Sequence, residues 1–402
     1  MPLTDVQKDI IKASIPVLKT SGVELTTRFY AHLLENHPDV RPFFNKAHQI
    51  TKSQPKILAF ALVAYAKNID DLTPLLPFVH KIVVKHIGLQ VQARHYDAVG
   101  TSLLHTLHAF LGGDAVATPE FMGAWKVAYY DLANILIEAE KSGYEKQQAE
   151  ANSWAGFRDF QVSQIVDECK DVKSVYFKPV GGNPKLVQPL PGQYVCARWT
   201  INGAETSREY SLSLPDVAEN TSHFRISCRR DTNNGVVSNF IHSELKVGDV
   251  VKITPPCGDF VYQKPVEKTG LSLFVGGIGI TPALSIIKTA LADDSTKDVR
   301  LFYSNSDAEC RAFADQLHAV AEAHPNFKLI EFVSAGNAKE SDSVNHTVHN
   351  RRLAETDFDF VTNALDYYVL GPQSYMKFVT AAIGAKGVTA EIRTESFTVT
   401  SA

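Results

Sequence analysis

The chain has 402 residues, a length that predicts two or three domains at roughly 150 residues per domain. Hydrophobic residues make up 45% and charged residues 21% of the chain, as in ordinary globular proteins, and the formal charge of −4 argues against nucleic acid as a partner. No run of about 18 apolar residues occurs, and the N-terminal segment is too polar for a signal peptide. We therefore expect a cytoplasmic protein without a membrane span.

The five cysteines argue against an iron–sulfur cluster. They are widely separated and form no C-x-x-C motif, whereas the ligands of such a cluster are closely spaced. We expect reduced thiols that pack as small apolar residues. If electrons move through this protein, they use another carrier.

The first 150 residues have the periodicity of amphipathic helices. A capped helix is predicted after Thr4, and a second helix over residues 24–34, which the His37-Pro38 pair ends. Residues 45–51 are polar, and we predict a loop or short turn there. The next helical face begins at Gln54, a polar residue that either lies at the surface or directs a donor into a pocket.

Residues 75–88 predict a helix that ends with a histidine on its apolar face. Val79, Ile82, Val83 and His86 recur at spacings of three, four and seven, so the imidazole of His86 joins the side that faces the core. A single histidine in this position is more often a hydrogen-bonded core residue than a metal ligand. The helix alone leaves both interpretations open.

From about residue 150 the helical periodicity gives way to alternation. Short alternating runs separated by Gly, Pro and Asn clusters suggest an antiparallel barrel. The barrel contains the motif Arg208-Glu209-Tyr210-Ser211, in which a guanidinium suits phosphate, although this short motif is weak evidence by itself. Residues 235–238 begin a short helix and offer backbone N–H groups to phosphates.

The last third alternates strands and helices, which predicts a parallel α/β domain. A buried strand leads into Gly277-x-Gly279, which permits a tight turn and close approach of a pyrophosphate to the helix start, and Pro282 fits the first helical turn. Further elements are predicted at residues 299–304 (strand), 310–323 (helix), 367–370 (strand) and 375–383 (helix).

The first third resembles the globin domain of the flavohaemoglobins. The matching residues are Phe29-Tyr30, the PFFN segment at 42–45, Gln54 with Leu58, Lys85-His86, Tyr96 and Glu140. The resemblance implies that His86 is the proximal ligand of a haem b iron and that Phe44 packs against the porphyrin. Tyr30, Gln54 and Leu58 would line the distal side. Tyr96 and Glu140 would form a relay that raises the basicity of the proximal imidazole.

The rest of the chain resembles the FAD and NAD(P)H modules of the ferredoxin reductase superfamily. The resemblance implies that Arg208 pairs with the FAD pyrophosphate, that Tyr210 flanks the isoalloxazine, and that Ser211 binds near its reactive nitrogen. Phe397 would reach back over the flavin, beside Glu395. The sequence departs from the superfamily in three places, which are Leu370 before Gly-Pro, Arg393-Thr394 before Glu395, and the tail at residues 398–400.

We therefore expect an all-α globin domain over residues 1–150, an antiparallel β-barrel FAD domain over 151–265 and an α/β parallel-sheet NAD(P)-binding domain over 266–402. The expected metal ligand is His86, and the expected catalytic residues are Tyr30, Gln54, Tyr96 and Glu140. The expected cofactor contacts are Phe44, Leu58, Lys85, Tyr194, Arg208, Glu209, Tyr210, Ser211, Gly235, Val237, Ser238, Gly276, Gly277, Gly279, Ile280, Thr281, Pro282, Gly371, Pro372, Glu395, Ser396 and Phe397.

The resemblance implies a nitric oxide dioxygenase with NO, O₂ and NAD(P)H as its small-molecule partners. Hydride would pass from NAD(P)H to FAD, and single electrons from FAD to the haem, whose oxygen adduct converts NO to nitrate. Two alternatives stay open, an oxygen-binding or sensing haemoprotein with a built-in reductase, and a flavin reductase for ferric or quinone acceptors. We expect a monomer. For the choice of nicotinamide, Asp307 disfavours a 2′-phosphate and Arg311 favours one.

Overall fold

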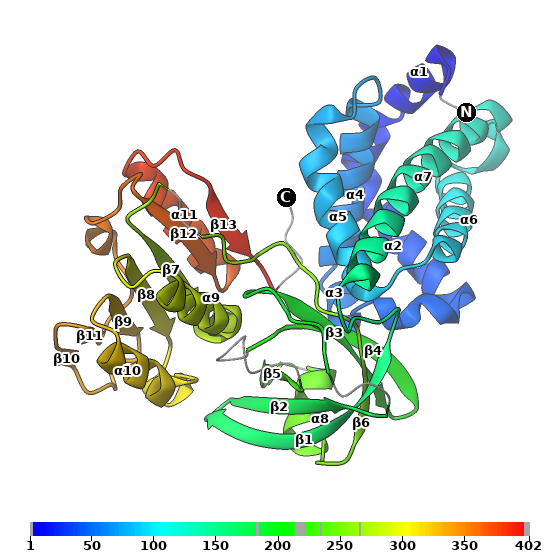
Figure 1. The fold of residues 1–402 in the computed structure, drawn as a ribbon. Coiled ribbons are helices and arrows are strands. Elements are labelled where there is room, and N and C mark those ends of the chain that lie inside the picture. Colours follow the sequence, from blue (N-terminus) through cyan, green and yellow to red (C-terminus); the bar gives the residue numbers. More distant parts are fainter. Residues whose placement is uncertain (1–2, 182–184, 214–221, 234, 265–266, 398–402) are drawn as a thin grey trace. The chain divides into compact units, whose positions relative to one another are not determined.

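The computed structural model describes residues 3–181, 185–213, 222–233, 235–264 and 267–397 (Figure 1). The described residues form two compact units, of which the first contains residues 3–157 with 198–208, and the second contains the described residues from 158 to 197 and from 209 to 397. The predicted boundary at 265/266 and the tail beyond residue 397 lie outside the described residues. Among the described helices, none combines the length and the apolarity that crossing a bilayer requires.

The first unit is built mainly from helices. Thr4 caps the first of them through a capping box, because its hydroxyl accepts from the backbone N–H of Gln7 and the Gln7 side chain accepts in return. The second helix ends before His37-Pro38, as predicted. The helices are α1 (Asp5–Ala13), α2 (Ile15–Asn36), α3 (Lys46–Ile50), α4 (Ser53–Lys67), α5 (Leu76–Leu89), α6 (Ala93–Phe110) and α7 (Pro119–Ala149).

Two predictions for this region were wrong, one about a loop and one about where a helix begins. The loop predicted at 45–51 contains the short helix α3. The helix predicted at 24–34 is the end of α2, which begins nine residues earlier at Ile15 with Pro16 in its first turn. Gly22 weakens the helical pattern in the sequence, yet an added Cβ there would lie 3.3 Å from Ala59 Cβ. The glycine therefore serves close packing of α2 on α4.

An antiparallel sheet forms the middle of the chain, with the strand order β4-β3-β6-β1-β2-β5. Strand β1 pairs antiparallel with both β2 and β6, and β2 pairs antiparallel with β5. A bridge between Leu212 and Ile226 joins the end of β4 to β5. The strands are β1 (Arg158–Cys169), β2 (Val172–Pro179), β3 (Tyr194–Ile201), β4 (Ala204–Ser211), β5 (Phe224–Arg229) and β6 (Val250–Ile253), with α8 (Val236–Ser243) between the last two.

A second sheet of seven strands, in the order β10-β11-β9-β8-β7-β12-β13, forms the last third. Its pairs are parallel except β10 with β11. The strands are β7 (Gly270–Gly276), β8 (Asp298–Asn305), β9 (Phe327–Val333), β10 (Ser341–Asp342), β11 (His346–His349), β12 (Leu365–Leu370) and β13 (Ile392–Glu395). The helices are α9 (Ile280–Asp293), α10 (Ala314–Ala323) and α11 (Gln373–Ala385).

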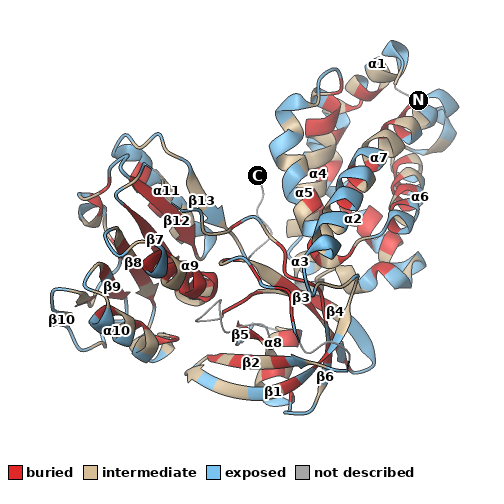
Figure 2. Ribbon diagram, in the orientation of Figure 1, coloured by how far each residue is buried: buried red, intermediate tan, exposed pale blue. Residues whose placement is uncertain are grey.

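Helices cover both faces of this sheet, whose central strands are buried (Figure 2). One face packs alternate strand residues against α9 and α10, and the other packs the intervening residues against α11. The helix predicted to start at residue 310 starts at Ala314 instead. Cys310 ends a short 3₁₀ turn after Asp307, and Phe313 has the left-handed φ of 62° that separates this turn from α10.

Candidate active site

The side chain of His86 is held from one side by two residues of neighbouring helices. Its Nδ1 lies 2.7 Å from Glu140 Oε1 of α7 and 3.0 Å from Tyr96 Oη of α6. Tyr96 Oη also donates to Glu140 Oε1, and the Glu140 side chain is only 2% exposed. No described residue bonds to Nε2 of His86. A histidine whose Nδ1 is fixed by a carboxylate presents Nε2 to a metal, so the donor set fits a haem iron.

The backbone at the end of α5 is fixed by a tyrosine that the sequence reasoning missed. Tyr144 Oη donates to Val91 O at 2.6 Å and to His86 O at 3.2 Å. Because Tyr144 follows Glu140 by one helical turn, both residues lie on the same face of α7. This spacing was the available signal, since it placed a second polar group beside the predicted relay.

Two of the three predicted distal residues, Tyr30 and Leu58, lie in one apolar cluster. Tyr30 is 8% exposed and packs its ring edge-on against Phe44 at 5.6 Å, with Leu58 in the same apolar cluster. Burial raises the pKa of Tyr30, so its hydroxyl stays protonated and able to donate. Gln54 accepts a hydrogen bond from Gln49 Nε2 at 2.7 Å, a partner that sequence reasoning did not identify. Lys85 is exposed on α5.

In the second unit, Tyr194 is influenced by residues from two other predicted motifs. The pKa of Tyr194 is raised well above its usual value, and the main cause is burial. Cys257, through its charge and a hydrogen bond, and the charges of Glu209 and Glu395 raise it further. Tyr194 also pairs through its backbone with Cys257, at 2.9 Å in both directions. Tyr194 therefore lies close enough to Glu209 and Glu395 for their charges to act on it, beside a thiol that the sequence reasoning did not assign to the site.

The phenol of Tyr210 hydrogen-bonds with the Cys228 thiol, whose pKa burial raises to about 12. Ser211 follows at the end of β4 and is buried. Arg208 donates through Nη1 to Ser207 O at 2.7 Å and to Thr206 Oγ1 at 3.0 Å. The guanidinium is thus held by its own strand and, through Nη2, by Asn45 Oδ1 at 2.9 Å.

Local hydrogen bonds join the first turn of α8 to the residues that precede the helix. Ser238 Oγ accepts from Asp231 N at 3.1 Å and donates to Gly235 O at 3.3 Å, while Val237 is buried beneath. An added Cβ at Gly235 would lie 2.6 Å from Asp231 Cβ. Asp231 is a further residue at this position that the motif analysis missed, because it precedes the glycine motif and does not belong to it.

The glycine turn after β7 and the Gly-Pro turn after β12 pack backbone against backbone. An added Cβ on Gly371 would lie 3.1 Å from both N and Cα of Gly276, and one on Gly279 would lie 3.1 Å from Leu370 Cβ. The adjoining residues Ile280, Thr281 and Pro282 are buried in the first turn of α9, and Gly277 has a φ of 55°. Pro372 caps α11. The carboxyl ends of the strands thus form a surface of bare backbone, which suits a pyrophosphate.

We expect Gly371→Ala to destabilise the protein and to raise the KM for NADH. Gly371 has a φ of 147°, and a methyl group there meets backbone atoms that cannot move aside. The loss of stability should be about 1–3 kcal/mol, measured by denaturant unfolding. Gly384→Ala is the matched control, because Gly384 lies within α11 and no atom lies within 4 Å of an added Cβ. A KM as low as that of the parent in Gly371→Ala would contradict this reading of the turn.

The C-terminal motif places Glu395 next to the Gly-Pro turn. Glu395 pairs with Leu370 in the parallel register of β12 and β13, and its Oε1 accepts from Ser396 N at 3.2 Å. Phe397 is 45% exposed and makes no ring stacking contact with a described residue. Leu370, one of the departures noted in the sequence, thus lies beside both Gly279 and Glu395.

Asp307 and Arg311 both follow β8. Asp307 Oδ1 accepts from Glu309 N at 2.8 Å and from Asn337 Nδ2 at 3.1 Å. Arg311 Nη1 donates to the buried carboxylate of Glu331 at 3.2 Å. The guanidinium that would favour a 2′-phosphate is therefore already paired with a carboxylate.

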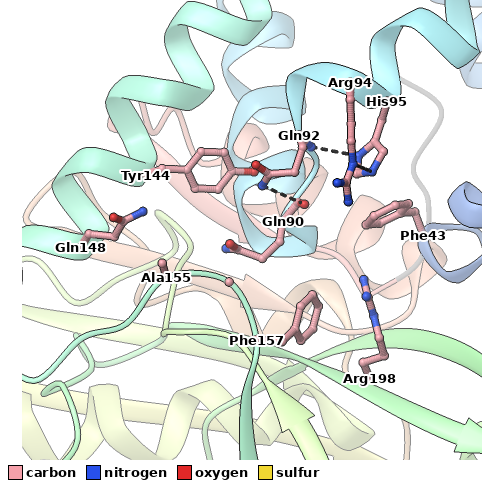
Figure 3. A pocket seen from close by; sticks show the side chains of 11 residues that line it. Phe43, Gln90, Gln92, Arg94, His95, Tyr144, Gln148, Ala155, Phe157 and Arg198 are labelled. Atoms are coloured by element: carbon pink, nitrogen blue, oxygen red, sulfur yellow. Dashed lines mark hydrogen bonds between the residues drawn. The ribbon is translucent and has the colours of Figure 1, made fainter.

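A pocket of about 460 Å³ lies in the first unit and contains none of the predicted site residues (Figure 3). Its wall includes Tyr144, whose hydroxyl fixes the end of α5, and the two arginines Arg94 and Arg198. The guanidinium of Arg198 lies 4.0 Å from the centre of the Phe157 ring. Arg198 therefore packs in the pocket wall through a cation–π contact with Phe157.

Comparisons with known proteins find the same order of three domains that the sequence analysis predicted. A globin model matches residues 27–136, an oxidoreductase FAD-binding domain matches 159–262, and an oxidoreductase NAD-binding domain matches 273–381. The chain is 46% identical to a flavohemoprotein of Schizosaccharomyces pombe, covering 96% of this chain and 90% of the relative. It is 45% identical to a flavohemoprotein of Candida albicans, covering 96% and 95%. A crystal structure of the Malassezia yamatoensis flavohemoglobin, with bound FAD and heme, has the same fold at a TM-score of 0.83 and 23% identity, covering 98% of this chain and 100% of that chain.

A globin followed by FAD-binding and NAD-binding domains defines an NAD(P)H-dependent oxidoreductase that carries both a haem and a flavin. The fold class and the cofactor set of haem, FAD and a nicotinamide dinucleotide are thereby confirmed. The chain belongs to the flavohemoprotein family.

Proposed function

We propose that this protein is a nitric oxide dioxygenase that removes NO. The observation that carries the proposal is the contact of His86 Nδ1 with both Glu140 and Tyr96. A haem that only stores oxygen needs no strongly donating proximal imidazole, whereas oxygen activation benefits from one. Overall, two NO and two O₂ would be consumed per NAD(P)H, giving two nitrate ions, NAD(P)⁺ and one proton.

The bound groups supply hydride (NAD(P)H), conversion of hydride into single electrons (FAD), and oxygen binding with one-electron chemistry (haem). The chain supplies the environment for these steps. Glu140 draws the Nδ1 proton of His86 toward itself and increases electron density at Nε2. Tyr30 offers a protonated hydroxyl on the distal side, while Phe44 and Leu58 exclude water from that pocket.

We propose further roles for the cofactor contacts in the second unit. Tyr194, together with the Glu209 and Glu395 carboxylates that help to raise its pKa, would lie near the position where a nicotinamide and a flavin exchange hydride. The bare backbone of the Gly276 and Gly371 turns would bind the dinucleotide pyrophosphate. We also propose domain boundaries near residues 150 and 265, the first of which lies directly after the end of α7 at Ala149.

One assay tests the function directly. Aerobic oxidation of NADH by the holoprotein should rise sharply when NO is added, and nitrate should appear at two equivalents per NADH. An oxygen sensor or a simple flavin reductase would show no such rise. If NO only inhibits NADH oxidation, the dioxygenase proposal is wrong.

Tyr30→Phe is expected to speed dissociation of O₂ by about tenfold. The variant removes one hydrogen-bond donor at a buried position, a loss of about 1–2 kcal/mol. The rate is measured by stopped-flow trapping with carbon monoxide. Tyr130→Phe, which removes a hydroxyl from a half-buried residue on α7, serves as the control and should leave the rate unchanged. An unchanged rate in Tyr30→Phe would refute the distal role of this residue.

A further inference from the structure

A fully buried carboxylate lies in the NAD-binding part of the chain, far in sequence from every predicted site residue of the haem. Glu331 is in β9, between β8 and β11, and has no solvent exposure. Its Oε2 lies 2.7 Å from His346 Nε2, 3.1 Å from His318 Nε2 and 3.2 Å from Arg311 Nη1. The function proposed above uses none of these four residues. They therefore need a separate explanation.

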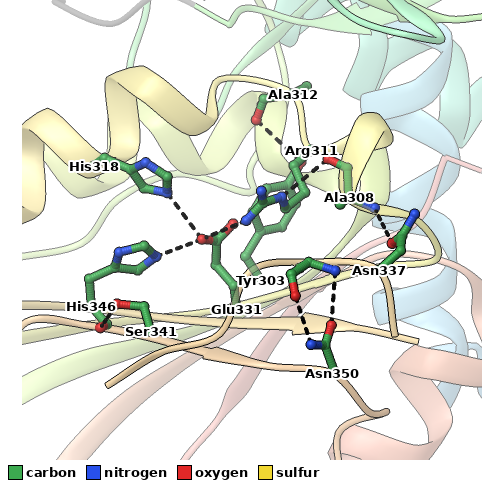
Figure 4. Close-up of polar contacts among 11 residues, drawn as sticks. Tyr303, Ala308, Arg311, Ala312, His318, Glu331, Asn337, Ser341, His346 and Asn350 are labelled. Atoms are coloured by element: carbon green, nitrogen blue, oxygen red, sulfur yellow. Dashed lines mark hydrogen bonds and ion pairs between the residues drawn. The ribbon is translucent and has the colours of Figure 1, made fainter. Parts of the chain in front are cut away.

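The two imidazoles converge on one carboxylate oxygen (Figure 4). His318 comes from α10 and His346 from β11, so three separate elements each contribute one potential ligand atom. These three atoms lie within 4.8 Å of one another. Imidazole nitrogen and carboxylate oxygen are preferred ligands of Zn²⁺, and three protein ligands leave a fourth position for water.

The hydrogen-bonding pattern of Glu331 is unbalanced. Three donors point to Oε2, whereas Oε1 is buried and has no hydrogen-bond partner among the described residues. Arg311 alone neutralises the charge of this carboxylate, so the two histidines are not needed as counter-ions. A buried carboxylate oxygen without a partner is costly, and its presence calls for a reason.

We propose that His318, Glu331 and His346 form a binding site for a divalent cation of the zinc class. With metal–ligand bonds of about 2.0–2.1 Å, tetrahedral ligand atoms are about 3.3 Å apart. The separations of 2.7 and 3.1 Å from Oε2 to the two imidazoles need to widen by about 0.6 and 0.2 Å. Side-chain rotation supplies such a movement without displacing a strand.

Among the described residues, Arg311 is the group in contact with the cluster that opposes a cation. Because Oε1 has no partner, the guanidinium can keep its ion pair with the same carboxylate through Oε1 while the metal takes Oε2. Two positive groups then share one carboxylate. We therefore expect moderate affinity, with a dissociation constant of about 1–10 µM, rather than the tight binding of a structural zinc site.

The test is calorimetric titration of the zinc-free holoprotein with zinc chloride. One equivalent should bind, and both His318→Ala and His346→Ala should weaken this binding at least about 100-fold. His324→Ala is the matched control, since His324 caps the same helix α10 outside the cluster, and it should bind as tightly as the parent. Flavin and haem absorbance and circular dichroism report the folding of each variant.

X-ray absorption at the zinc edge of the unmodified protein tests the ligands without any substitution. The spectrum should show two imidazoles, additional oxygen and no sulfur. A sulfur ligand would assign the metal to the cysteines and overturn the proposal. The same holds if no stoichiometric binding occurs below about 100 µM zinc, or if binding persists unchanged in both histidine variants. None of these outcomes depends on NO turnover, so this site and the proposed function can fail separately.

Discussion

Replacing His86 with alanine is expected to abolish haem retention and, with it, NO-stimulated oxidation of NADH. Nε2 of His86 is the atom that we propose as the iron ligand, because Glu140 and Tyr96 engage Nδ1, and alanine offers no donor in its place. Transfer of electrons from NADH to ferricyanide should persist, because that reaction needs only the nicotinamide and the flavin. The measurements are Soret absorbance per flavin and the NADH oxidation rate with and without NO.

The matched control for this variant is His80→Ala. His80 is exposed on the same helix α5, and its replacement should leave haem content and NO turnover at the parent values. A His86→Ala protein that retains full haem and full turnover would place the iron on another residue. Loss of ferricyanide reduction together with haem would instead indicate that the substitution disrupts folding of the whole chain.

Glu140→Gln is expected to lower NO turnover by about 10–100-fold while the haem stays bound. The substitution keeps the shape of the side chain but removes its negative charge, at a position that is 2% exposed and 2.7 Å from His86 Nδ1. The imidazole then donates less electron density to iron, so the reduction potential of the haem should rise. Potentiometry and the iron–histidine stretching frequency measure this effect separately from turnover.

Glu138→Gln provides the comparison for that experiment. Glu138 lies two residues earlier on α7 and is exposed, so its charge is screened by water. We expect a parent-like potential and parent-like turnover. If Glu140→Gln also leaves the potential and the stretching frequency unchanged, the carboxylate does not tune the proximal imidazole, and its burial serves packing only.

Much of the fold could be predicted from local sequence because local chemistry determines it. Thr4 caps a helix with its own neighbour Gln7, and His37-Pro38 ends a helix for steric reasons confined to two residues. The extent of α2 was missed because Gly22 lowers helix propensity. Its benefit comes from close contact with Ala59 on another helix, and such a gain cannot be read from a local pattern.

In the candidate site, too, features that depend on contacts between distant elements could not be predicted from local sequence. The resemblance to a family pointed to His86, Tyr96 and Glu140, and the structure shows all three in contact. Asp231 and Tyr144 were not identified, because their partners belong to other turns or helices. The cluster of His318, Glu331 and His346 is even harder to predict from the sequence. Its members are 13 and 15 residues apart, and only the pairing of β9 with β11 and the packing of α10 bring them together.

Helix α7 holds both the side chain and the backbone of His86, because Glu140 binds the His86 imidazole and Tyr144 binds the His86 carbonyl. One more turn along, Gln147 accepts from Gln90, which follows the end of α5. An insertion of a single residue between Glu140 and Tyr144 would rotate one against the other by about 100°. This limits where the globin part can be fused to another protein. If it is joined to a different electron donor, α7 must be kept intact through Gln147, and the fusion point must lie after that residue.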